Sequence, residues 1–126
     1  MARDWEEFDY RPKVVLSDLH VSIGPRGRML IGKKVMERLN EPGAVMLFYC
    51  PDEKIIGVRP VHPRNPKAIT LRSNGRDKYR LLPVVVFCQK YGIELGRTFV
   101  FDMPEIDSGT LLLDTKAVTY IGKARK

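Results

Sequence analysis

Residues 21–49 carry the most informative series of structural signals in the chain. Strand-like residues lead into a turn at 24–27 that holds Gly24, Pro25 and Gly27. A second strand, a short amphipathic helix from Lys33, a break at Pro42 and a third, apolar strand follow. A unit of this size is too small to bury its own apolar side chains. Something outside this unit must complete the core, and the chain carries a candidate for it.

The second half of the chain repeats this order and can supply the completion. The matching parts are Gly32 and Pro83, the predicted helices 33–39 and 84–90, and the predicted hairpins 44–58 and 98–114. Such duplication predicts two halves, related by a pseudo-two-fold axis, that share one core. Coincidence is the alternative, because strand–helix–hairpin is a common order and the halves share few identities.

Three prolines between Arg59 and Pro66 exclude a helix or an inner strand there and predict a stiff connector. We therefore expect a mainly β protein with short helices. Its predicted parts are an acidic and aromatic arm (1–13), a first half (14–59), a proline-rich connector (60–67), a second half (68–121) and a basic tail (122–126).

Two segments are informative about burial. Residues 84–91 are ambiguous, since their valines favour a strand while Gly92 is typical of a helix end. The match with 33–39 favours a helix, whose surface would be apolar and would face a dry interface. Residues 44–49 are nearly all apolar, which predicts a strand buried on both faces.

The charge of the chain favours a polyanionic partner. The formal net charge is +7 and the sequence pI is about 9.6, which fits DNA, RNA or an anionic surface. Residues 1–10 sum to −3, residues 11–80 to +9 and residues 81–126 to +1, which together give +7. This asymmetry predicts a basic face rather than a uniform coat, although many small basic proteins bind no nucleic acid.

Other classes of protein receive less support from the sequence. Cys50 and Cys88 lie 38 residues apart and lack metal-ligand spacing, so we expect structural or free thiols and no metal or cofactor. The acidic N-terminus does not fit a signal peptide, and the longest apolar run, 81–88, is too short to span a bilayer. These features predict a cytoplasmic protein without a membrane segment.

Residues Gly27 to Gly43 (GRMLIGKKVMERLNEPG) resemble the AbrB/MazE/SpoVT family of swapped-hairpin DNA-binding domains. The family pattern has a glycine, a basic or polar residue, a β run ending in Ile-Pro-Lys, a short helix ending in Leu, a glycine and a hydrophobic hairpin. The resemblance covers residues 20–60 well and 68–114 weakly, and a tandem copy in one chain is similar to the MraZ arrangement.

The resemblance implies a swapped-hairpin β-barrel built from two AbrB-like halves. It also implies DNA contacts from basic residues near the first hairpin and helix start, at the matching positions Arg26, Arg28, Lys33 and Lys34. The chain departs from the pattern at Gly32, where the family has proline, and at Val84, where it has lysine. A symmetric DNA footprint is therefore not expected.

A second basic cluster surrounds the predicted hairpin turn at Asn74 and Gly75. Its members are Arg72, Arg76, Lys78 and Arg80. Pseudo-symmetry predicts that this turn lies beside the Arg26/Arg28 turn and enlarges one basic face. The alternative is an edge strand that carries charge against aggregation.

These observations favour a DNA-binding protein, a transcription regulator or the antitoxin of a toxin–antitoxin pair, that forms an oligomer. The alternatives are a protein-interaction module, in which the acidic arm or the 84–88 helix docks a partner such as a toxin, and an RNA-binding module. An enzyme is not expected. Ser17, Asp18 and His20 read as a turn rather than a catalytic triad, and no Walker or dinucleotide motif is present.

Overall fold

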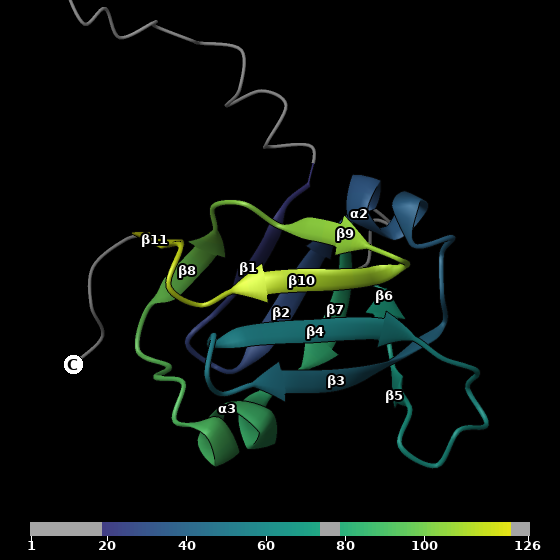
Figure 1. The fold of residues 1–126 in the computed structure, drawn as a ribbon, viewed down its shortest axis with the longest axis horizontal. Helices are drawn as coiled ribbons and strands as arrows, with labels where there is room; N and C mark the ends of the chain where they lie inside the picture. Colours follow the sequence, from purple (N-terminus) through teal and green to yellow (C-terminus); the bar gives the residue numbers. More distant parts are fainter. Residues whose placement is uncertain (1–18, 74–78, 122–126) are drawn as a thin grey trace, which may run out of the picture.

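The computed structural model describes residues 19–73 and 79–121, which form two antiparallel β-sheets stacked on one another (Figure 1). The six-stranded sheet has the order β11-β8-β1-β2-β7-β6 and the five-stranded sheet the order β5-β3-β4-β10-β9. The strands are β1 (Val21–Ile23), β2 (Arg28–Gly32), β3 (Ala44–Cys50), β4 (Ile55–Pro60), β5 (Ile69–Thr70), β6 (Arg72–Ser73), β7 (Tyr79–Pro83), β8 (Thr98–Phe101), β9 (Glu105–Asp107), β10 (Thr110–Asp114) and β11 (Val118–Ile121). The described helices are α2 (Lys33–Arg38) and α3 (Val85–Tyr91).

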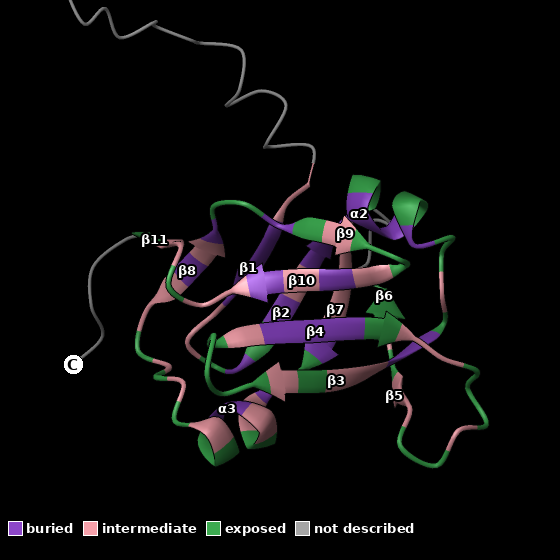
Figure 2. Cartoon of the chain, in the orientation of Figure 1, coloured by how far each residue is buried: buried purple, intermediate pink, exposed green. Residues whose placement is uncertain are grey.

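The core lies between the two sheets, and both halves of the chain contribute to it (Figure 2). Ile31 and Val58 from the first half and Leu82 and Leu113 from the second are fully buried. Helix α2 adds the apolar stripe expected from its sequence, since Val35 and Met36 are buried. Neither half therefore has a complete core of its own, as the unit size predicted.

Strands β2 and β7 pair antiparallel within the six-stranded sheet, with Leu30 opposite Leu81. Leu30 and Leu81 are 51 residues apart, the same separation as Gly32 and Pro83. A residue that pairs with its own equivalent lies next to a local two-fold axis. The predicted duplication thus has a geometric counterpart in the pairing of β2 with β7.

Two of the strand pairings between the halves are reciprocal. Strand β3 of the first half pairs with β5 of the second, and β8 of the second half pairs with β1 of the first. Strands β5 and β6 are separated only by Leu71, so the chain passes there from one sheet to the other. Starting at β4 and leaving β9 and β10 aside, the pairings run β4-β3-β5/β6-β7-β2-β1-β8-β11. Exchanging β4 with β11, β3 with β8, β5/β6 with β1 and β7 with β2 gives the same order read backwards.

The helical interpretation of residues 84–90 is confirmed, since α3 spans Val85–Tyr91 and ends at Gly92 with φ 70°. Val84 is buried, and its N–H donates to Gly27 O at 2.8 Å. The lysine of the family pattern would not fit at this buried position. The glycine at position 32, where the family pattern has proline, also has a local explanation. The Gly32 N–H donates to His20 O at 2.7 Å, and a Cβ at this position would lie 3.0 Å from that oxygen.

The mainly β class is confirmed, but the two sheets do not close into a barrel. The predicted hairpin at 98–114 is wrong. Strand β8 pairs with β1 and β11, whereas β10 pairs with β4 and with β9, a strand inside the segment expected to be a turn. Ser108 and Gly109 both have positive φ, which closes a tight β9–β10 hairpin instead.

The expectation that residues 44–49 are buried on both faces is also wrong. Phe48 is 37% exposed on the outer face of the five-stranded sheet, where the Arg59 guanidinium lies 4.6 Å from its ring centroid. In the described part of the chain no helix covers this face (Figure 1). The run of apolar residues therefore predicted the strand correctly, but the prediction that both of its faces are buried was wrong.

Candidate nucleic-acid interface

The pairing of β2 with β7 decides which basic side chains share a face. Directly opposite residues in antiparallel strands point to the same side of the sheet, and Arg28 lies opposite Pro83 while Met29 lies opposite Leu82. Met29 and Leu82 are fully buried and point into the core. Arg28, Leu30 and Leu81 therefore lie on the outer face of the six-stranded sheet.

Arg72 joins Arg28 on that face, because Arg72 on β6 lies opposite Leu81 on β7. Both arginines are exposed. Together with Ser73, Leu81, Leu82 and Pro83 they line a groove of about 490 Å³, here called the basic groove. The structure thus brings together one predicted residue from each half of the chain.

The β1–β2 turn holds Arg26 next to this groove. Gly27 has φ 78° and accepts a hydrogen bond from Val84 N–H, which fixes the turn against the start of α3. Arg26 and Arg28 flank Gly27 and are exposed. Three guanidinium groups are therefore carried by or next to ordered strands, where they can donate paired hydrogen bonds to phosphate or to guanine.

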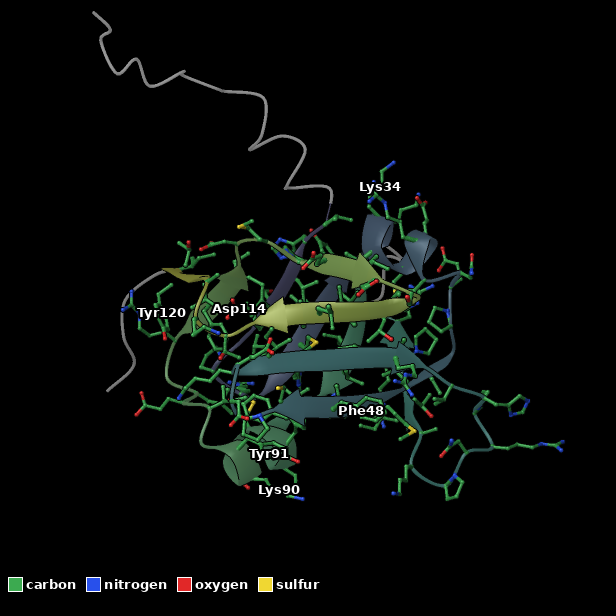
Figure 3. The ribbon with its side chains drawn as sticks, in the orientation of Figure 1. Lys34, Phe48, Lys90, Tyr91, Asp114 and Tyr120 are labelled. Carbon is green, nitrogen blue, oxygen red and sulfur yellow. The ribbon has the colours of Figure 1, made fainter. Side chains whose placement is uncertain are left out.

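Lys33 and Lys34 lie at the other end of β2, so they do not extend the same cluster. Both are exposed at the start of α2, and the five residues of β2 separate Lys33 from the β1–β2 turn by about 17 Å. Figure 3 shows Lys34 on the opposite side of the molecule from Lys90 and Tyr91 of α3. The four positions given by the resemblance form two separate pairs.

The second predicted cluster is divided as well. Arg80 lies opposite Ile31, on the core side of the sheet, is half-buried, and donates from Nη1 to Tyr79 O at 3.4 Å. Arg76 and Lys78, with the turn expected at Asn74, lie outside the described residues. Tyr79, where the described chain resumes, lies opposite Gly32, at the end of β2 away from Arg26 and Arg28.

Acidic residues are absent from the strands of the basic groove and concentrated elsewhere. Strands β1, β2, β6 and β7 contain no Asp or Glu, whereas residues 101–115 contain four acidic and no basic residues. In the described part of the chain one salt bridge forms, between Lys116 and Asp114 at 2.9 Å, and the hydrogen bond from Lys116 lowers the pKa of Asp114. The arginines of the basic groove keep their charge unneutralised by any carboxylate of these residues.

Sequence reasoning missed a second groove, between α3 and strands β3 and β5. It has a volume of about 510 Å³ and mainly apolar walls, and Lys67 and Lys90 stand at its rim. Cys88 of α3 is buried against the core, whereas Val86, on the side of the groove, is 77% exposed. The sequence feature that indicated this groove was the apolar surface predicted for the helix at 84–90.

The side chains that could ligate a metal ion are scattered in the described residues. No three His, Cys, Asp or Glu side chains of residues 19–73 and 79–121 gather in a group that could hold a metal ion.

Burial raises the pKa of the Cys88 thiol to about 11 and lowers the pKa of His20. Within the same residues, every helix is too short or too polar to cross a bilayer.

A comparison of the chain with protein-family models, curated proteins and solved structures found no match. The function is therefore inferred from the geometry and charge of the grooves described above.

Proposed function

We propose that the protein binds duplex DNA through the basic groove, as a transcription regulator or an antitoxin. The observation that carries this proposal is the convergence of Arg28 and Arg72 on one groove of a sheet face without acidic residues. Arginine forks pair with phosphate oxygens and with guanine O6 and N7. Arg26 next to the groove adds a third cation for the phosphate backbone.

We also propose that the fold is an AbrB-like pair of halves with exchanged hairpins. The antiparallel pairing of Leu30 with Leu81 and the reciprocal pairings of β3 with β5 and β8 with β1 support it. The family positions Lys33 and Lys34 would then make a second phosphate contact at the other end of β2. An oligomer of the chain would present several such surfaces and gain affinity through avidity.

Salt-dependent binding tests the proposal directly. Fluorescence anisotropy with a labelled random-sequence duplex would compare the wild type with Arg26→Ala/Arg28→Ala/Arg72→Ala at several salt concentrations. Each neutralised phosphate contributes about −0.9 to the slope of log K against log salt. The triple variant should bind more weakly at every salt concentration, with a slope shallower by about 2 to 3.

The matched control is Lys54→Ala/Arg59→Ala/Lys116→Ala, which removes the same charge from the side of the five-stranded sheet. Both variants reduce the formal net charge from +7 to +4 (7 − 3). Equal loss of affinity in the two variants would mean that net charge, not the basic groove, drives binding. Tighter binding of duplex RNA than of DNA in competition would favour the RNA-binding alternative.

A further inference from the structure

The apolar groove beside α3 has a composition that restricts its occupant. Its walls include Met46 and Leu47 of β3 and Val86, Phe87 and Tyr91 of α3. Phe87 and Tyr91 belong to an aromatic cluster with Tyr49, with ring centroids 4.6 to 6.0 Å apart. An occupant that buries itself here needs apolar or aromatic side chains.

The rim of the groove adds a charge requirement. Lys67 and Lys90 are exposed there, and neither forms a salt bridge with a carboxylate of the described residues. Lys90 Nζ lies 5.5 Å from the ring centroid of Tyr91 (Figure 3), so a positive charge stands directly beside the aromatic wall. The groove thus fits a segment that alternates aromatic and acidic residues.

The chain contains such a segment before its first described residue. Residues 5–10 read Trp-Glu-Glu-Phe-Asp-Tyr, with three aromatic and three acidic side chains. The aromatic side chains match the walls of the groove, and the carboxylates match the two lysines at its rim. Both requirements are therefore met by six consecutive residues of the same chain.

The tether between this segment and the first described residue is long enough to reach the Val85 edge of the groove. His20 lies at the Gly32 end of β2, whereas Gly27, at the other end, lies against Val85 of α3. The five residues of β2 between these points span about 17 Å. Tyr10 precedes Leu19 by nine positions, and nine extended residues reach about 30 Å.

We propose that residues 5–10 of the chain dock in this groove of the same molecule. The aromatic side chains lie against α3 and β3, and the carboxylates lie at Lys67 and Lys90. A short tether gives the segment an effective concentration on the order of millimolar, which favours its own groove over that of a second copy.

The only tryptophan of the chain, Trp5, makes the docking directly measurable. In the full-length wild type, Trp5 emission should be blue-shifted and protected from acrylamide quenching. Val86→Asp places a negative charge in the groove and should raise the quenching constant to that of a free peptide of residues 1–13. Because Val86 is 77% exposed, this substitution removes little buried surface and should leave the protein folded.

Met103→Asp is the matched control, since Met103 is 66% exposed and lies outside the groove lining. It should leave Trp5 protected, whereas Lys67→Glu/Lys90→Glu should release it. The proposal is overturned if the wild type is quenched as strongly as the free peptide. It is also overturned if, on dilution, Trp5 loses its protection from quenching while the molecular mass falls. That result would mean that the segment docks in the groove of a second copy of the chain. Neither readout involves DNA, so a failure of docking is distinguishable from a failure of DNA binding.

Discussion

Among the individual residues, Gly27 connects the site to the fold. It combines a left-handed backbone with close packing, because its φ is 78° and a Cβ there would lie 2.1 Å from Val85 Cγ2. Its carbonyl also accepts the hydrogen bond from Val84 N–H. The glycine between the two arginines of the turn is therefore required by backbone geometry and by the approach of α3.

Gly27→Ala should be strongly destabilising. The left-handed conformation costs a residue with a Cβ about 1 to 2 kcal/mol and overpacking adds about 1 to 3, so the free energy of unfolding should fall by about 2 to 5 kcal/mol. Gly24→Ala is the control in the same turn, since no atom lies within 4 Å of its added Cβ, and it should change stability by less than about 1 kcal/mol. Urea unfolding would measure both, and equal effects would contradict the assigned turn geometry.

Among the strands, the pairing of β2 with β7 determines both the core and the basic groove. Leu30→Cys/Leu81→Cys in a Cys50→Ser background should form a disulfide under mild oxidation. Direct partners in antiparallel strands have Cα atoms about 4.5 to 5.5 Å apart, within the range that a disulfide spans. Thiol titration of the denatured, oxidised protein should then find Cys88 as the remaining free thiol.

A diagonal pair provides the control for this register. Arg28 and Leu81 share a face but are not opposite each other, and diagonal neighbours are about 7 to 8 Å apart, too far for an unstrained disulfide. Arg28→Cys/Leu81→Cys should therefore stay reduced under the same conditions. Faster oxidation of the diagonal pair would show that the register is shifted.

The helices and strands also differ in how far their sequences predict them. Helix α3 was predictable because the duplication resolved an ambiguous run of valines, and α2 because its apolar spacing is local. The β9–β10 hairpin and the separation of β8 from β10 were not, since strand partners are chosen by tertiary packing rather than by local pattern. The dependence of strand pairing on tertiary packing also limited the prediction of the site.

Arg28 and Arg72 were recognised as basic turn-flanking residues, but their common groove depends on the direction in which β7 runs beside β2.

Across the whole chain, the two halves depend on one another. Four strand pairings join them, namely β2 with β7, β3 with β5, β1 with β8 and β4 with β10, among the described residues. Separating the halves would expose the edges of all these strands and one side of the shared core. The basic groove would be lost as well, because Arg28 and Arg72 belong to different halves.

Fragments 1–66 and 67–126, divided in the proline-rich connector, test this dependence. Neither fragment should unfold cooperatively as a monomer, because each keeps its local hairpins but lacks the strands that complete its core. An equimolar mixture should form a one-to-one complex and recover a single cooperative transition, since the break lies between β4 and β5 in a segment without strand pairing. Circular dichroism melting and sedimentation would follow both properties. A monomeric 1–66 fragment with a cooperative, concentration-independent transition would instead establish that the first half folds alone, and the reciprocal pairing would then not be needed for its stability.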